Sequence, residues 1–283
     1  MRRHPLSLAF LSCAELTPDA AVHAAAAAGY DFVGLRFLPA ATDGPYPIMD
    51  DPALQARVAR ALSETGVGLA DIEIARLGPD TDVAVFGPFL ELGERLGARN
   101  VLVAGDDADH GRLTETFARF CDLAAPHGLT ADLEFMPWTG LRSLPEALRV
   151  VEDAARPNGG VLVDALHWSR SDGTCAQVRA LPHARINYAQ LCDGPVPFDR
   201  DDASLIAVAR GARLPPGRGG IDLVGLVRSL PEGTVLSLEV PEVEATRIAD
   251  PVARARALRM AAQAVLAAAG RGSADEDMRE PPD

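Results

Sequence analysis

Four oxygen-bearing side chains each lie near the end of a short apolar run that is typical of a buried strand. They are Glu134 in LTADLEFMP, Asp164 in GVLVDALH, Gln190 in INYAQLCD and Glu239 in VLSLEVP. A charged group late in a buried strand costs free energy unless it is paired or binds a metal. The C-terminal strand ends of a closed parallel barrel meet on one face, so we expect these residues to form one site.

The chemistry of this set is that of a hard-cation site. Three carboxylates and one amide oxygen suit Mn²⁺ or Mg²⁺ better than an ion that prefers thiolates. We therefore expect Glu134, Asp164, Gln190 and Glu239 to hold one divalent cation, with Co²⁺ or Zn²⁺ as alternatives. His167 follows Asp164 by three residues, and we expect it to support a ligand or to contact the substrate.

Further residues are expected at the rim of the same site. Arg36 and Glu73 lie late in two earlier strands and either bind substrate or form an ion pair with each other. Trp138 follows Glu134 by four residues, and its ring is expected to form a wall of the substrate pocket. Arg218 lies in the run PGRGG, which is either an anion-binding turn or an ordinary loop. Asp193 is expected to anchor a loop.

Eight predicted strands alternate with eight predicted helices, which indicates an α/β protein with a (β/α)8 TIM barrel in a single domain. An open, doubly wound sheet is the alternative. The expected strands are Leu6–Ser12, Asp31–Phe37, Val67–Ile74, Asn100–Ala104, Leu129–Phe135, Gly160–Asp164, Ile186–Leu191 and Val235–Val240. The expected helices are Thr17–Ala28, Asp51–Thr65, Asp80–Leu96, Gly111–Pro126, Ser143–Ala155, Cys175–Ala180, Asp222–Ser229 and Asp250–Ala269.

Two segments interrupt this alternation. The connection from Cys192 to Thr234 is long and holds an additional short helix, and long loops in a compact domain are usually functional. Residues 271–283 are acidic and polar, and we expect them to form a disordered tail after a barrel that spans residues 1–270.

Composition excludes several classes of function. The net charge of −13 disfavours binding to nucleic acid, because no basic patch interrupts it. No apolar run approaches the length of a membrane span, and the four cysteines show no metal or disulfide spacing. We expect a cytoplasmic protein with reduced cysteines, and a homo-oligomer is compatible with the sequence.

Together these residues resemble the xylose-isomerase-like barrel superfamily of sugar phosphate isomerases and epimerases, over roughly residues 5–268. The resemblance rests on Glu134, on Asp164 with His167, on the run Gln190 to Asp193, and on Glu239, which fall in order on the matching strands. Many members have a histidine where this chain has Gln190. A glutamine there is similar to the pattern of bacterial 3-dehydroshikimate dehydratases. Apurinic endonucleases of the superfamily resemble the chain in fold only.

The resemblance implies a metal-dependent isomerase or epimerase that acts on a sugar, sugar phosphate or cyclitol hydroxy-ketone through an enediolate. Glu134 and Glu239 are then the catalytic base and acid. A dehydratase on the same scaffold is the alternative, with His167 as proton donor. A catalytically silent accessory or binding subunit is a second alternative, suggested by Gln190 and Arg218.

Overall fold

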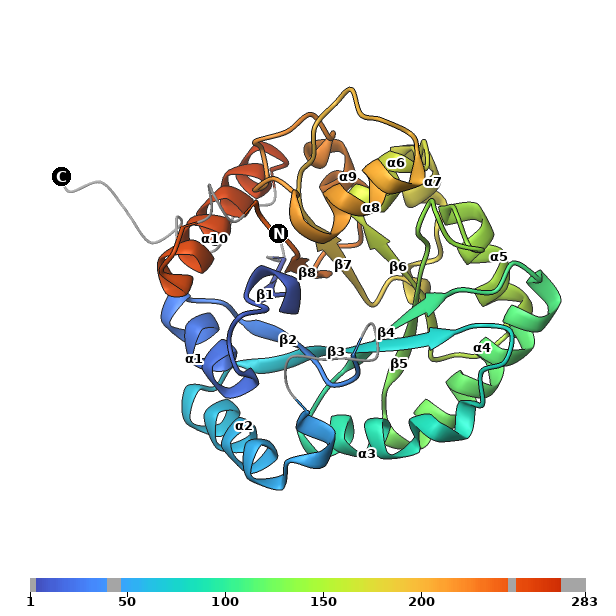
Figure 1. Ribbon diagram of the computed structural model, residues 1–283. Helices are drawn as coiled ribbons and strands as arrows, with labels where there is room; N and C mark the ends of the chain where they lie inside the picture. Colours follow the sequence, from blue (N-terminus) through green and yellow to red (C-terminus); the bar gives the residue numbers. More distant parts are fainter. Residues whose placement is uncertain (1–3, 40–46, 244–247, 271–283) are drawn as a thin grey trace.

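The structure is a computed structural model that describes residues 4–39, 47–243 and 248–270. Its eight parallel strands close into a barrel in the order β1-β2-β3-β4-β5-β6-β7-β8, with helices arranged around them (Figure 1). The predicted TIM barrel is therefore confirmed, and the open sheet is excluded. The strands are β1 (Leu6–Leu8), β2 (Phe32–Arg36), β3 (Gly68–Leu77), β4 (Asn100–Gly105), β5 (Thr130–Glu134), β6 (Gly159–Asp164), β7 (Tyr188–Leu191) and β8 (Val235–Leu238).

Most helices begin where the sequence offers a cap. Asp51, Asp109 and Asp250 each accept a hydrogen bond from a backbone N–H of the first helical turn. Gly29 and Gly66 end two helices in the left-handed conformation, which glycine adopts without steric cost. The helices are α1 (Pro18–Ala28), α2 (Pro52–Thr65), α3 (Gly87–Arg95), α4 (His110–Ala124), α5 (Leu144–Ala154), α6 (Ala165–Arg170), α7 (Cys175–Ala180), α8 (Asp202–Gly211), α9 (Leu223–Ser229) and α10 (Pro251–Ala268).

The main core lies between the ring of helices and the outer faces of the strands. A second, smaller apolar cluster is made of strand residues and Met136. Its buried members are Ala70, Ile74, Leu102, Ala104, Met136, Leu162, Tyr188 and Val235. Among the described residues, no helix is long and apolar enough to cross a membrane, and all four cysteines are free thiols.

The structure differs from the predicted elements in several places. The first strand ends at Leu8, and a 3₁₀ turn, η1 (Phe10–Ser12), replaces its expected second half. The helix expected over Asp80–Leu96 is divided into a 3₁₀ turn and α3, because Pro88 is suited only to the start of a helix. The short α6 was not predicted; it begins directly after Asp164, whose side chain caps it. The expected tail, residues 271–283, lies outside the described residues.

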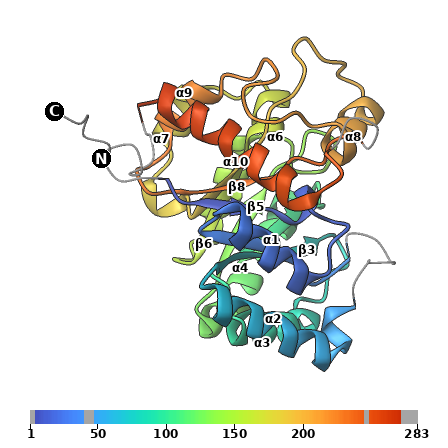
Figure 2. The same cartoon turned by 90° about the vertical axis from the view of Figure 1, so that its left-hand side faces the viewer.

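The long connection between β7 and β8 carries α8 and α9 (Figure 2). Asp193, just after β7, pairs with Leu214 through two backbone hydrogen bonds of 2.8 and 2.9 Å. Its carboxylate accepts hydrogen bonds from the backbone N–H groups of Gly194, Gly217 and Ile221. Asp193 therefore anchors this connection, as expected, and fixes the chain that follows α8 against the barrel.

Candidate metal centre and active site

Strand register places the four predicted ligands on the inner face of the barrel. Asp164 pairs with Gln190, and Gln190 pairs with Ser237, which precedes Glu239 by two residues. Glu134 pairs with Leu162, two residues before Asp164. Paired residues of parallel strands point to the same face, and so do residues two apart. Alternation along β5 to β8 therefore directs all four side chains inward.

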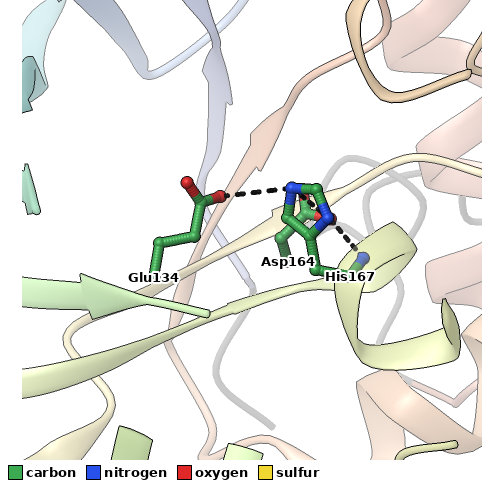
Figure 3. A group of neighbouring side chains, drawn as sticks. All are labelled: Glu134, Asp164 and His167. Carbon is green, nitrogen blue, oxygen red and sulfur yellow. Dashed lines mark hydrogen bonds and ion pairs between the residues drawn. The ribbon is translucent and has the colours of Figure 1, made fainter. Parts of the chain in front are cut away.

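The tightest cluster contains Glu134, Asp164 and His167, whose possible ligand atoms all lie within 4.8 Å of one another. Figure 3 shows the His167 ring beside Asp164 and facing Glu134. The ring Nε2 lies 3.8 Å from Glu134 Oε1 and 3.9 Å from Asp164 Oδ1. The backbone N–H of His167 donates to Asp164 Oδ1 at 2.9 Å, which holds the two residues together at the start of α6. All three are buried, and His167 joins the predicted ligands as a further possible donor.

Gln190 and Glu239 form the other half of the site. The Gln190 amide donates to Glu239 Oε1 at 3.0 Å, whereas Gln190 Oε1 is buried and has no hydrogen-bond partner among the described residues. Glu239 lies outside the tight cluster but is joined to it through Arg213. One guanidinium nitrogen of Arg213 lies 2.6 Å from Asp164 Oδ2, and the other terminal nitrogen lies 2.8 Å from Glu239 Oε2.

Arg213 reaches the site because of the loop that Asp193 anchors. It directly precedes Leu214, the backbone partner of Asp193, and its own N–H donates to the Pro241 carbonyl just after β8. Its Nε donates to the Ala209 carbonyl at the end of α8. Its side chain is 97% buried, so the guanidinium is held among the carboxylates rather than in solvent. No sequence pattern predicted Arg213 as a site residue.

Burial and mutual repulsion control the protonation of the carboxylates. Burial raises the pKa of Glu134 well above its usual range, and the charges of Glu239 and Asp164 add to this effect. Burial likewise raises the pKa of Glu239 to about 7, although Arg213 opposes the rise. For Asp164, burial is outweighed by Arg213 and His167, so its pKa is lowered. Burial lowers the pKa of His167 to about 4, so its ring is neutral near pH 7.

These residues fit a divalent cation of the oxygen-preferring kind. Ionised Glu134, Asp164 and Glu239 carry three negative charges and Arg213 carries one positive charge, which leaves the two negative charges that a dication neutralises. Among the described residues nothing donates a hydrogen bond to Gln190 Oε1 or to the Glu134 carboxylate, so these oxygens are free to act as metal ligands. Each carboxylate that binds Arg213 keeps further lone pairs. The donor set therefore suits Mg²⁺ or Mn²⁺.

A cavity of about 310 Å³ opens beside this cluster. Glu134, His167, Arg213 and Glu239 line it, together with the predicted rim residues Arg36, Glu73 and Trp138. Arg36 and Glu73 form an ion pair at 3.2 Å while they line the cavity, so the ion-pair alternative is confirmed and their contact with substrate stays a prediction. The second oxygen of Glu73, Oε1, is buried without a hydrogen-bond partner among the described residues. The Trp138 ring meets the His167 ring edge to face, with 5.0 Å between centroids.

Two further arginines line the cavity and were not predicted. Arg76 forms an ion pair with Asp106 at 2.7 Å. Arg210, on the last turn of α8, is exposed and makes no hydrogen bond or ion pair with any described residue. A guanidinium without a partner at the mouth of a cavity is suited to binding a carboxylate or phosphate of a ligand. Arg76 lies near the end of β3, beyond the predicted end of that strand at Ile74, and Arg210 lies on a helix surface, where arginines are common.

Arg218 is not among the residues that line this cavity. It lines a separate groove with Val224 on α9 and Met260 on α10. The backbone N–H groups of Gly217, Arg218 and Gly220 are used within the loop itself, by Asp193, Pro215 and Gly194. These bonds favour ordinary loop structure over an anion-binding turn. The structure therefore does not bring Arg218 to the site.

The raised carboxyl pKa values give a first prediction, on stability. Burial raises the pKa of Glu239 and of Asp132, a buried residue on β5, to about 7 in the folded protein. The folded state therefore binds more protons than the unfolded state above pH 4.5. This contribution stabilises the protein at low pH and is lost as the pH rises through 7. His167, whose pKa is lowered in the folded state, has the opposite effect on stability, but only below its ordinary pKa of about 6.5. With chelator present, the thermal unfolding midpoint should therefore decrease when the pH is raised from about 6.5 to about 8.

Thermal unfolding with EDTA or with MgCl₂ at both pH values measures this effect. Magnesium should raise the midpoint more at the higher pH, because cation binding must displace the protons that the carboxyls hold. An equal rise at both pH values would contradict the prediction. A midpoint that increases with pH in EDTA would do so as well.

Comparison with known proteins agrees with this architecture. The family model described as xylose isomerase-like TIM barrel matches residues 22–263. A 3-dehydroshikimate dehydratase of Pseudomonas aeruginosa is 27% identical over 143 residues, which is 48% of this chain and 22% of that protein. The chain therefore matches less than a quarter of this curated relative.

Solved structures show the same fold. A fusion of a xylose isomerase-like TIM barrel with a 4-hydroxyphenylpyruvate dioxygenase aligns with a TM-score of 0.78 at 20% identity, over 99% of this chain and 46% of that protein. The IOLI protein with a bound zinc atom aligns with a TM-score of 0.74 at 16% identity, over 95% of this chain and 99% of that protein. D-allulose 3-epimerase from Methylomonas sp. aligns with a TM-score of 0.67 at 18% identity, over 93% of this chain and 98% of that protein. With the barrel and its family match established, the chain belongs to the xylose isomerase-like TIM barrel family.

Proposed function

We propose that this protein is a divalent-metal-dependent lyase that dehydrates a hydroxy-ketone bearing a carboxylate, of the 3-dehydroshikimate type. The observation that carries the proposal is the inward cluster of Glu134, Asp164, Gln190 and Glu239. It lies beside a cavity that Arg210 also lines, with a guanidinium that pairs with no described residue. Two observations support dehydration. Gln190 stands where many family members have a histidine ligand, and one relative is a 3-dehydroshikimate dehydratase. The partnerless Arg210 supports an anionic substrate.

In this proposal Glu134, Asp164, Gln190 and Glu239 would hold one Mg²⁺ or Mn²⁺ ion, and His167 lies beside Glu134 and Asp164. When bound, the cation would polarise the ketone oxygen and stabilise the negative charge that develops on it. Glu134 removes the proton from the carbon next to the ketone, because no described residue hydrogen-bonds to its carboxylate and it lines the cavity.

Dehydration then requires a second proton transfer. The bond between carbon and the hydroxyl oxygen breaks, and that oxygen leaves as water after taking up a proton. The neutral His167 ring lies 3.8 Å from Glu134 and lines the same cavity. It is suited to pass on to the leaving oxygen the proton that the carboxylate has taken from carbon. Trp138 packs edge to face against this ring.

Epimerisation of a neutral ketose is the second candidate. Glu134 and Glu239 both line the cavity and come from β5 and from the end of β8, so they can reach opposite sides of one substrate. The barrel also aligns with D-allulose 3-epimerase, a likeness that by itself concerns the fold. In this reaction Glu134 would remove the proton and Glu239 would return one to the other face of the same carbon.

A panel of ketones in D₂O with Mg²⁺, followed by proton NMR, tests the proposal. We expect 3-dehydroshikimate to lose water, and neutral ketoses such as D-allulose to react poorly or not at all. Deuterium incorporation and epimerisation of a neutral ketose without any dehydration would favour the second candidate. Failure of every ketone to exchange or react, with metal bound, would exclude both candidates.

The ligand set also predicts the metal preference. Because Gln190 offers an oxygen rather than a nitrogen, Mn²⁺ or Mg²⁺ should restore activity after chelation at least as well as Zn²⁺. Gln190→His should shift the preference toward Zn²⁺ or Co²⁺. Activity of the native protein that only zinc restores would show that the oxygen-rich set does not govern the choice of metal.

A further inference from the structure

Ser12 lies outside the cavity, yet it contacts the backbone on both sides of Glu239. Its hydroxyl donates to the Leu238 carbonyl at 2.7 Å and accepts from the Val240 N–H at 2.8 Å. Ser12 is buried, so water does not compete for these two bonds. The Leu238 carbonyl and the Val240 N–H belong to the two peptide groups that flank Glu239, so Ser12 holds the backbone before and after this residue.

The contact compensates for a missing stretch of strand. β1 and β8 are neighbours in the barrel and pair through Leu8 and Leu238, with the Ala9 N–H as the last backbone donor to Leu238 (Figure 1). Beyond that point the chain turns into η1 and offers β8 no further backbone partner. Ser12, the last residue of η1, supplies one donor and one acceptor through its side chain. On the opposite side, the Glu239 N–H donates to the Leu191 carbonyl of β7 at 3.2 Å.

Ser12 is itself held in place by α10. Arg254 is buried, and its Nε donates to the Ser12 carbonyl at 3.3 Å. The same guanidinium donates to the Ile248 carbonyl and forms an ion pair with Glu15. A buried side chain that makes three such contacts has little freedom to move. The position of Ser12, and through it the backbone at Glu239, is therefore fixed by a helix outside the barrel.

We propose that Ser12 is a positioning residue for Glu239, which sets the direction of that carboxylate toward the metal and substrate. The inference rests on the proposed metal site. Without the hydroxyl, the Val240 N–H loses its partner, so the peptide group between Glu239 and Val240 is held less firmly. The peptide group before Glu239 keeps its bonds to Ala9 and Leu191. Residues that orient metal ligands in this indirect way typically change metal affinity by 10- to 100-fold when they are removed.

The test measures Mn²⁺ affinity by titration, well below the unfolding midpoint, for the native protein and for Ser12→Ala. We expect the variant to bind Mn²⁺ about 10-fold or more weakly while it remains folded. Ser229→Ala is the matched control: its buried hydroxyl also donates to a carbonyl, Gly225, and accepts from Arg179, but it lies on α9. The control should bind Mn²⁺ like the native protein.

A double-mutant cycle separates positioning from general stability. If Ser12 acts through Glu239, Ser12→Ala should add little further loss of affinity in a Glu239→Gln background. An equal loss in both backgrounds, or native affinity in folded Ser12→Ala, would overturn the inference. Failure of the native protein to bind Mn²⁺ would instead refute the proposed metal site, so the two outcomes are distinct.

Discussion

The Glu134→Gln variant should lose solvent deuterium exchange at the carbon next to the substrate ketone, with kcat reduced by about 10³-fold. The substitution preserves shape but removes the base. Glu134 is buried, lines the cavity and lies 3.8 Å from His167, and burial raises the pKa of its carboxyl well above the usual range. A glutamine amide cannot accept the proton from carbon, whichever reaction follows.

Metal content must be measured on the same variant, because Glu134 is also a proposed ligand. A variant that retains bound metal and loses exchange identifies Glu134 as the base. Loss of metal would show that its role as ligand dominates. Glu152→Gln is a suitable control, since Glu152 is an exposed residue on α5. Undiminished exchange in folded, metal-loaded Glu134→Gln would exclude Glu134 as the base for both candidate reactions.

The part of the site that lies on strands was predictable from the sequence. Polar residues such as Glu134, Asp164 and Gln190 interrupt apolar runs at strand ends, and alternation alone directs them inward. The eight-fold repetition of strand and helix signals likewise predicts a closed barrel, which the structure confirms. These are local patterns of period two or about 3.6 residues, so they can be read from neighbouring residues.

The residues that were missed depend on contacts distant in the sequence. Arg213 lies in an irregular connection, and it reaches Asp164 only because Asp193 pairs with Leu214. Ser12 was assigned to the first strand, because FLS continues an apolar run and nothing nearby marks the turn that replaces the strand. One signal was available for Arg213: several buried carboxylates require a compensating cation, and the long connection was already expected to be functional.

Arg213 and a bound metal ion would both neutralise the same carboxylates, and each therefore affects the stability of the folded protein. The guanidinium is part of the chain and contacts Asp164 and Glu239 directly, whereas a cation binds and dissociates. Arg213 lowers the pKa of Asp164 despite its burial, so that carboxylate stays ionised as a ligand even without metal. The protein is therefore expected to fold without metal, with Glu134 and Glu239 holding the protons that the cation later displaces.

The second large effect follows from this arrangement: Arg213→Leu should destabilise the metal-free protein by about 3–5 kcal/mol, the usual cost of leaving a buried charge without its partner. Magnesium should recover part of this loss, because the dication binds the folded state and supplies positive charge to the same carboxylates. Arg213→Lys should be intermediate, since one ammonium keeps the charge but cannot place two separate nitrogens against Asp164 and Glu239.

Chemical denaturation with EDTA and with MgCl₂ measures both parts of this prediction. Arg200→Leu is the control, because Arg200 makes a comparable two-nitrogen pair with Asp172 at 2.8 and 2.9 Å, but with both side chains largely exposed. Exposed pairs contribute about 1 kcal/mol or less, so this variant should unfold nearly as the native protein does and should not respond to magnesium differently. A loss in Arg213→Leu no larger than in the control would mean that solvent or protonation compensates the carboxylates. In that case the buried guanidinium would not determine their charge, and the count of two residual negative charges that favours a dication would no longer hold.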